Sequence, residues 1–160
     1  MGEKKLGGAG LRGQVAGNTA LSTVGKTGKG LTYRGYAIEE LAEKASFEEV
    51  AYMLLYGSLP TQSEYDNYSA KLKSFRSLPE ALKEVLERIP QTAHPMDVMR
   101  TGCSMLGNLE PEGDFSNQND TADRILASMS SIITYWYRYS HDGVKVDTAT
   151  DHETIGGQFL

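Results

Sequence analysis

Hydrophobic residues recur with the period of an α-helix through residues 120–140, and this pattern constrains the fold more than any other. The pattern consists of Ile125, Leu126, Met129, Ile132, Ile133, Trp136 and Tyr137. A spacing of three and four residues over between three and four turns is typical of an amphipathic helix that packs one face on a core. We therefore expect the longest helix of the chain over about residues 120–140.

Shorter segments repeat the same period on both sides of that helix. We expect a short helix from Ile38 and further helices that begin at Phe47, at Thr61 or Ser63, at Pro79 and after His94. A polar loop over 108–119 and a last helix from Asp151 complete the expected order. In the second of these helices the core-facing pattern begins at Phe47, after a Ser46 and Glu49 pair that predicts a capping box. Gly57 and Pro60 mark its end. The fold class is therefore predicted to be mainly α.

The N-terminal region has a different composition. Residues 1–17 are rich in glycine and are predicted to form an extended arm. Two β-prone runs, 19–24 and 31–36, enclose a glycine-rich turn and predict a small hairpin. We therefore divide the chain into an arm over 1–17 and a mainly helical part over 18–160.

Composition excludes several classes of protein. The 160 residues carry a net charge of −5, the basic residues are scattered, and no hydrophobic run approaches the ~20 residues of a membrane span. We expect neither a nucleic-acid nor a membrane partner. A single cysteine, Cys103, excludes an internal disulfide and fits a reducing, cytoplasmic location. It is predicted to be a buried thiol in a helix.

Motif searches give no catalytic or metal site. Gly25-Lys26-Thr27 resembles the end of a P-loop, but Ala20 stands where the first glycine is needed. His94, His141 and His152 lack the spacing of metal ligands, and no Ser-His-Asp or Cys-His set can be assembled. His94 before Pro95 is interpreted as a structural residue at a helix entry, and His141 is expected just after the long helix. The aromatic run 135–139 is more typical of a helix deep in a bundle or at a subunit contact than of a base-stacking surface.

Several segments, taken in order, resemble the N-terminal part of the citrate synthase family. They are Gly10-Leu11-Arg12-Gly13, 19–25, Leu31-Thr32-Tyr33-Arg34-Gly35-Tyr36, 47–52, Leu59-Pro60, Ile89-Pro90, His94-Pro95-Met96-Asp97, 135–141 and Thr154-Ile155-Gly156-Gly157. The last two segments are most similar to the branch of the family that uses propionyl-CoA. The resemblance covers about residues 10–160.

This resemblance implies a mainly α-helical enzyme with a large and a small domain that works as a homodimer. The family condenses oxaloacetate with an acyl-CoA through acid–base chemistry and then hydrolyses the thioester. It implies no metal and no cofactor, since acyl-CoA is a substrate. The chain is identified as part of the large domain, and we expect it to be truncated, with its partner being the missing C-terminal part of the same enzyme.

The resemblance places no catalytic residue in this chain, because the family's catalytic His, His and Asp lie in motifs beyond the equivalent of Leu160. It carries two binding residues over. Arg12 matches an arginine that contacts CoA phosphate, a role that suits a guanidinium. Lys73 falls near a basic position linked to substrate in some members. An exposed loop Arg and an exposed helix Lys are the alternatives.

Two other functions remain open. The parent enzyme could be a citrate synthase that uses acetyl-CoA, since the residues that line the acyl pocket are largely absent. The fragment itself, which we expect to be inactive, could instead be a helical module that self-associates through its exposed hydrophobic faces.

Overall fold

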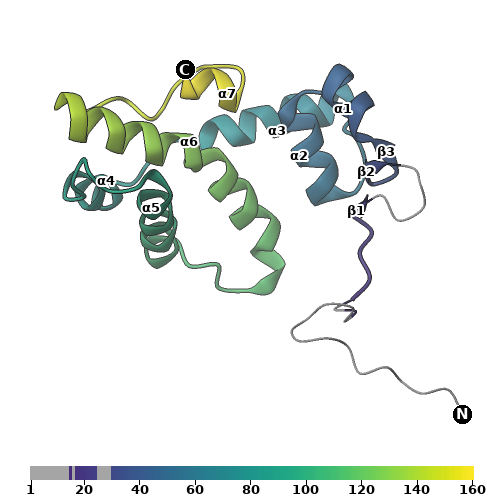
Figure 1. The fold of residues 1–160 in the computed structure, drawn as a ribbon, viewed down its shortest axis with the longest axis horizontal. Coiled ribbons are helices and arrows are strands. Elements are labelled where there is room, and N and C mark those ends of the chain that lie inside the picture. The colour runs from purple at the N-terminus through teal and green to yellow at the C-terminus, as the bar shows by residue number, and fades with distance from the viewer. Residues whose placement is uncertain (1–14, 16, 25–29) are drawn as a thin grey trace, which may run out of the picture. The chain divides into compact units, whose positions relative to one another are not determined.

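The structure is a computed structural model that describes residues 15, 17–24 and 30–160 (Figure 1). The chain divides into two compact units, one ending at Lys44 and the other running from Ala45 to Leu160. Most of the predicted arm over 1–17 lies outside the described residues, so its boundary stays a prediction. None of the helices in the described part of the chain is both long enough and apolar enough to cross a membrane.

The first unit contains a small antiparallel sheet and one helix. Strands β1 (Ser22–Val24), β2 (Leu31–Tyr33) and β3 (Tyr36–Ala37) lie in that order, with Thr23 opposite Thr32 and Thr32 opposite Ala37. The sequence predicted two strands, and the third is a correction. Arg34 and Gly35 both adopt positive φ, 49° and 93°, which folds the run 31–36 back on itself as a two-residue hairpin turn. Helix α1 (Ile38–Lys44) follows directly.

The second unit is helical, as predicted. Its elements are α2 (Phe47–Tyr56), α3 (Gln62–Ser74), α4 (Glu80–Glu87), α5 (Pro95–Leu109), the 3-10 turn η1 (Phe115–Asn117), α6 (Gln118–Asp142) and α7 (Ile155–Phe159). Together with the sheet of the first unit, they confirm the mainly α fold class with a small N-terminal β element.

Local capping explains where several of these helices begin and end. The capping box of Ser46 with Glu49 is present, and Thr61 forms a second one with Glu64. Gly57 ends α2 in the left-handed conformation, with φ 107°. His94 caps α5 through its ring, which accepts a hydrogen bond from the Met96 amide at 3.2 Å, so its predicted structural role at the helix entry is confirmed.

Two hydrophobic clusters form the core of the helical unit, and α6 contributes to both. The larger cluster joins α4, α5 and the C-terminal half of α6 through Leu78, Leu82, Leu86, Val98, Leu106, Ile132, Tyr135 and Trp136. The smaller joins α3 to the N-terminal half of α6 through Tyr68, Leu72 and Ala127. In Figure 1, α4, α5 and α7 accordingly lie beside α6, whereas α2 lies beside α3.

The buried face of α6 is more polar than its hydrophobic pattern predicted. Ile125 is exposed and Tyr137 is 52% exposed, which corrects two members of that pattern. The buried positions also include four polar residues that the pattern leaves out, Asp123, Ser128, Ser130 and Ser131. Small and hydrogen-bonding side chains are accommodated here because neighbouring helices and residues 145–158 supply polar partners.

Helix α6 changes direction part-way along its length (Figure 1). In this region the Ser128 hydroxyl donates to the Arg124 carbonyl at 2.6 Å, and the Thr134 hydroxyl donates to the Ser130 carbonyl at 2.7 Å. Hydroxyls that bond back to the preceding turn compete with the helix ladder and bend helices. The serine-rich centre of α6 is therefore the physical cause that the sequence offers for the change of direction.

Two further expectations need correction. In α2, Phe47 is 59% exposed, whereas Glu48 and Met53 are buried, so the core-facing side of that helix was predicted one residue out of phase. Helix α7 begins at Ile155 rather than at Asp151, because Thr154 is its N-cap. Residues before Thr154 are held in an irregular conformation by contacts with distant parts of the chain.

Candidate functional site

Of the two binding residues carried over from the family resemblance, the structure describes only Lys73. Arg12 and the segment Gly25-Lys26-Thr27 lie outside the described residues. Lys73 lies in the last turn of α3, and its Nζ forms an ion pair with Glu153 Oε1 at 3.0 Å. This pair lies at the surface, so Lys73 faces a carboxylate of its own chain in this conformation. Its role in substrate binding stays a prediction.

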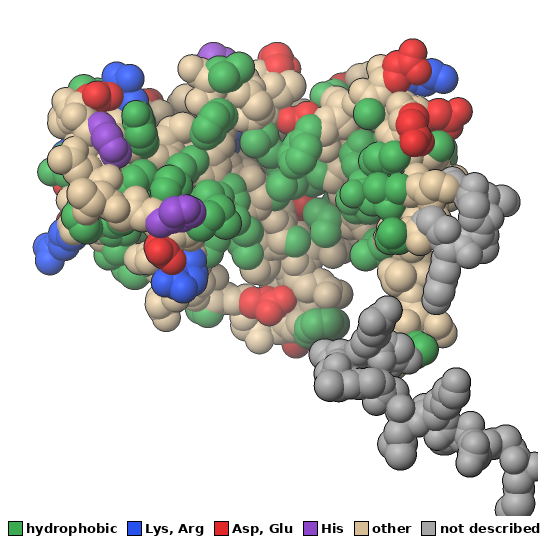
Figure 2. Space-filling view, in the orientation of Figure 1, with side chains coloured by type: hydrophobic (Ala, Val, Ile, Leu, Met, Phe, Trp, Pro, Cys, Tyr) green, Lys and Arg blue, Asp and Glu red, His purple; other side chains and the backbone are tan. Residues whose placement is uncertain are grey.

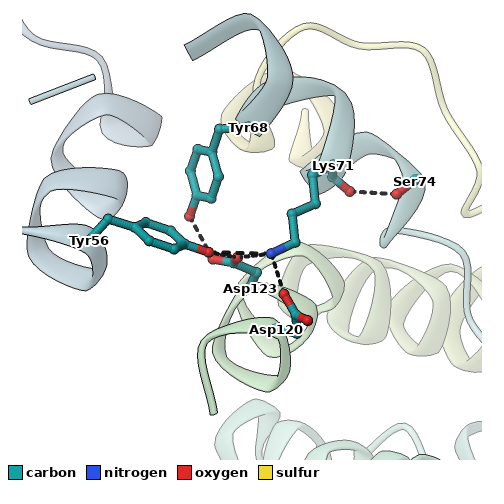
Figure 3. Close-up of polar contacts among 6 residues, drawn as sticks. All are labelled: Tyr56, Tyr68, Lys71, Ser74, Asp120 and Asp123. Atoms are coloured by element: carbon teal, nitrogen blue, oxygen red, sulfur yellow. Dashed lines mark hydrogen bonds and ion pairs between the residues drawn. The ribbon is translucent and has the colours of Figure 1, made fainter. Parts of the chain in front are cut away.

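The most densely bonded polar group of the helical unit surrounds Asp123 of α6 (Figure 3). Its carboxylate is fully buried. It accepts hydrogen bonds from Tyr56 of α2 at 2.5 Å and from Tyr68 of α3 at 3.0 Å. Lys71 Nζ lies 2.5 Å from Asp123 Oδ2 and 2.6 Å from the exposed Asp120 Oδ1. The cluster joins α2, α3 and α6 around the buried Asp123 carboxylate.

These contacts shift the protonation of the groups around Asp123. Burial, followed by the neighbouring carboxylate, raises the pKa of Tyr68 and also that of Tyr56. Burial alone would lower the pKa of Lys71, but its hydrogen bonds to Asp120 and Asp123 raise it overall. Every donor in the cluster therefore keeps its proton at neutral pH. A buried carboxylate that is bonded in this way stabilises the packing of the helices around it.

A solvent-open hollow of about 510 Å³ lies between the C-terminal ends of α3 and α5 and the start of α6. Arg124 is its principal cation, and Glu110 binds that guanidinium through two contacts of 2.7 and 2.8 Å. Arg124 also donates to the Phe75 carbonyl. Because these partners occupy the fork of the guanidinium, the hollow has no free cation that is ready to receive an anion.

Cys103 lines this hollow and is half-buried, which corrects the prediction of a buried thiol. Its sulfur lies 3.6 Å from the Met129 sulfur. Burial raises the pKa of the Cys103 thiol, so the reactive thiolate is disfavoured at neutral pH. These properties fit a packing role.

The three histidines lie apart in the structure, with different surroundings. His94 caps α5, His141 lies in the last turn of α6 with its ring stacked on Tyr137 at 4.2 Å, and the His152 carbonyl accepts from Arg76. His141 was predicted just after the helix and is in fact part of it. Among the described residues, no three His, Cys, Asp or Glu side chains are grouped so that they could hold a metal ion.

Arg76 and Glu48 are two buried charged residues that sequence reasoning missed. Arg76 is 1% exposed and Glu48 is 2% exposed. Arg76 Nη1 donates to the carbonyls of Thr150 and His152 at 3.2 and 2.6 Å, and Glu48 Oε1 accepts from the Ile155 amide at 2.8 Å. Both residues therefore bind the backbone that leads into α7.

Little in the sequence distinguishes these residues. Glu48 looks like an ordinary acidic residue in the first turn of a helix, and Arg76 follows the end of α3 in a polar run. Asp123 gives the clearest signal, since it lies four residues before Ala127 and therefore on the face that carries the core. Their partners are 52 to 107 residues away, beyond the reach of a periodicity argument.

Similarity to known proteins shows the family to which this chain belongs. The family model described as "Citrate synthase, C-terminal domain" matches residues 10–160. The chain belongs to the citrate synthase family. Its mainly helical fold and the order of its segments agree with the resemblance found in the sequence.

Individual relatives agree with this assignment. The chain is 68% identical to 2-methylcitrate synthase of Shewanella oneidensis over 98% of its own length and 42% of that protein. It is 34% identical to 2-methylcitrate synthase 1 of Corynebacterium glutamicum over 94% of its length and 40% of that protein. This citrate synthase family chain therefore spans about two fifths of the length of these curated relatives.

Solved structures support the same fold. Citrate synthase from Thermotoga maritima superposes with a TM-score of 0.74 at 33% identity, covering 84% of this chain and 35% of that one. A Thermoplasma acidophilum citrate synthase complex gives 0.81 at 21% identity, covering 93% of this chain and 40% of that one. The second likeness, at lower identity, shows the fold alone.

Proposed function

We propose that this chain supplies the N-terminal helical part of a 2-methylcitrate synthase. That enzyme condenses propionyl-CoA with oxaloacetate and hydrolyses the thioester to give 2-methylcitrate and CoA. The observation that carries the proposal is the 68% identity to the Shewanella protein over 98% of this chain. The parent enzyme is expected to be a cytoplasmic homodimer that needs no metal or cofactor.

Within this proposal the chain has a structural role and leaves the chemistry to other parts of the enzyme. The buried charged groups Glu48, Arg76 and Asp123 are bound by residues of their own unit. General acid–base catalysis needs a side chain within hydrogen-bond reach of substrate. We therefore propose that the 160-residue chain alone has no condensation activity.

A chimera tests the proposal directly. The segment of the Shewanella enzyme that matches this chain is replaced by the 157 matched residues of this chain. CoA release from propionyl-CoA plus oxaloacetate is then measured. Turnover by the chimera, together with none by the 160-residue chain, supports the proposal. A folded chimera without turnover contradicts the proposed role in a 2-methylcitrate synthase, and turnover by the isolated chain contradicts its purely structural role.

Citrate synthase with acetyl-CoA as substrate is the alternative within the family. Relatives named citrate synthase are 38% identical in Mycolicibacterium smegmatis and 32% identical in Acidithiobacillus ferridurans. The larger identity to a methylcitrate enzyme favours propionyl-CoA. Comparing kcat/KM for the two acyl-CoA substrates in a complete enzyme that contains this chain decides between them.

Self-association of the helical unit is an alternative function that is not enzymatic. Figure 2 shows hydrophobic side chains at the surface of this unit, with charged side chains scattered among them. Exposed members include Met96, Ile125, Tyr137 and Val144. Size-exclusion chromatography at several concentrations measures the association. An inactive chimera together with a stable oligomer of the isolated chain would favour this reading over the enzyme.

A further inference from the structure

Residues 145–158, which we call the strap, run from the end of α6 into α7 and are attached mainly through polar contacts. Thr148 is the fully buried residue of the strap, while its hydrophobic side chains Val146 and Ile155 are half-buried against the two core clusters. Hydrophobic burial is what normally makes a segment inseparable from its core. The strap has little of it.

The strap is attached at points spread over several elements. Thr148 Oγ1 accepts from the Leu78 amide at 3.1 Å, before α4. Further along, Glu153 pairs with Lys73 of α3 at 3.0 Å. In α7, Gln158 Nε2 donates to Ser131 Oγ of α6 at 2.5 Å, and its Oε1 accepts from Ser130 Oγ at 3.1 Å. In Figure 1 the strap and α7 run beside α6.

Arg76 and Glu48 hold the centre of the strap through the backbone contacts given above. Of the polar atoms here, Arg76 Nε and Thr150 Oγ1 are buried without a hydrogen-bond partner among the described residues. Burial is also the main effect on the Arg76 pKa, which it lowers. A desolvated guanidinium with an unpaired N–H opposes burial, and it regains water as soon as its cover is removed.

The free energy of closing the strap is therefore the sum of opposing contributions. Several hydrogen bonds favour closure, whereas the desolvation of Arg76 and of the Glu48 carboxylate favours opening. Opening rehydrates both charges and exposes little hydrophobic surface. The helices beneath keep their own clusters, because the strap supplies no fully buried member to either of them.

We propose that residues 145–158 form a releasable strap, closed on the helical unit by Arg76 and Glu48, that detaches together with α7 while α3 to α6 stay folded. Its release frees α7 to change direction relative to α6. The strap is thus a conformational device, and this proposal does not depend on the enzymatic assignment.

Amide hydrogen exchange of the 160-residue chain tests the strap. The Leu78 and Ile155 amides report on it, since their acceptors are Thr148 Oγ1 and Glu48 Oε1. The Ile132 amide, in the buried part of α6, reports on unfolding of the whole unit. We expect Leu78 and Ile155 to exchange at a common rate at least about tenfold faster than Ile132. Equal rates at all three amides would overturn the proposal.

Substitution of Arg76 shows whether it closes the strap. Arg76→Met leaves two carbonyls without their donor and removes the positive charge near Glu48, so exchange at Ile155 should rise about tenfold while Ile132 is unchanged. Arg88→Met, at the exposed C-cap of α4, is the matched control and should change neither. An equal rise at Ile132 would make Arg76 a general core residue and overturn its role.

A second variant keeps the test decisive if Arg76→Met does not fold. Thr148→Val has nearly the same shape and removes the acceptor of the Leu78 amide. Faster exchange at both Leu78 and Ile155 shows that the strap opens as one unit. Faster exchange at Leu78 alone would show independent contacts and contradict the proposal.

Discussion

At the scale of single residues, the helical unit depends on buried charges that are matched by distant partners. Asp123 receives two tyrosine hydroxyls and one ammonium group, and three helices meet there. A buried carboxylate is tolerated only when its oxygens are hydrogen-bonded and its charge is balanced. The cluster therefore fixes which faces of α2, α3 and α6 pack together.

Replacing Asp123 by Asn tests this matching of charge. The variant keeps the shape of the side chain but leaves Lys71 without its buried partner, so the free energy of unfolding should fall by about 2 kcal/mol. Asp120→Asn is the control, because its exposed carboxylate should contribute less than about 1 kcal/mol. Urea denaturation measures both variants, and equal losses would argue against a special role for the buried carboxylate.

The same cluster predicts a loss of stability at alkaline pH. The folded state raises the pKa of Tyr56 and Tyr68 in this cluster above the ordinary value of 10, chiefly through burial, and raises that of Tyr135, elsewhere in α6, for the same main reason. Above that pH the unfolded chain loses these protons and the folded chain keeps them, so the free energy of unfolding falls as pH rises. The raised pKa of Lys71 acts in the same direction.

Ultraviolet titration of tyrosinate measures this effect. Of the nine tyrosines of the sequence, the buried Tyr68 and Tyr135 should ionise only together with the loss of helical circular dichroism. A titration in which all tyrosines ionise near their ordinary pKa while the helices persist would contradict the predicted burial.

At the scale of elements, helix packing depends on how closely α5 approaches α6. Gly102 of α5 is buried against Ile132, and a Cβ placed on it would lie 2.5 Å from Ile132 Cγ2. Gly107 lies on the same helix, but a Cβ there would meet nothing within 4 Å. Substituting Gly102 therefore tests the close packing of α5 on α6, whereas substituting Gly107 tests helix propensity alone.

Alanine substitutions at these glycines should have opposite effects. Gly102→Ala forces the helices apart and should lower the free energy of unfolding by about 1–3 kcal/mol. Gly107→Ala relieves the unfavourable entropy of glycine in a helix and should raise it by about 0.5 kcal/mol. Thermal and urea unfolding compare the two, and a stabilised Gly102→Ala variant would contradict the close approach.

Elements whose signals are local could be predicted from the sequence. The capping box of Ser46 with Glu49, the end of α2 at Gly57 and the entry of α5 at His94-Pro95 depend on neighbouring residues, and the structure confirms them. The second hairpin turn was missed because Arg34 adopts a positive φ, which is uncommon for a residue that is not glycine. The buried face of α2 was predicted incorrectly because Phe47 was assigned to the core and Glu48, a charged residue, was assigned to the surface.

The candidate site was harder to predict. Arg76, Glu48 and Asp123 are charged, and hydrophobic periodicity assigns such residues to the surface. Their burial depends on acceptors and donors far along the chain. The family resemblance identified the family but directed attention to Lys73, which the structure places in a surface ion pair.

At the scale of the whole molecule, the two units differ in what holds them together. Both hydrophobic clusters lie within residues 45–160. The sheet of the first unit has three short strands, and small sheets of this kind are marginally stable in water. The helical unit therefore contains the elements needed for cooperative folding.

A shortened chain of residues 45–160 should fold without the first unit. We expect a helical circular dichroism spectrum and a single cooperative thermal transition, because every member of both clusters is retained. The full 160-residue chain is the reference. A non-cooperative transition in the shortened chain, next to a cooperative one in the reference, would show that the first unit is needed for the core.

The contact between Glu48 and Ile155 also bears on how the protein is made. The two residues are 107 positions apart, so α2 emerges from the ribosome long before its partner amide has been synthesised. Until then the Glu48 carboxylate must stay hydrated. The Arg76 guanidinium likewise stays hydrated until the carbonyls of residues 150 and 152 have been synthesised. These side chains therefore stay hydrated on the nascent helices, and their contacts form only after residues 150–155 have left the exit tunnel.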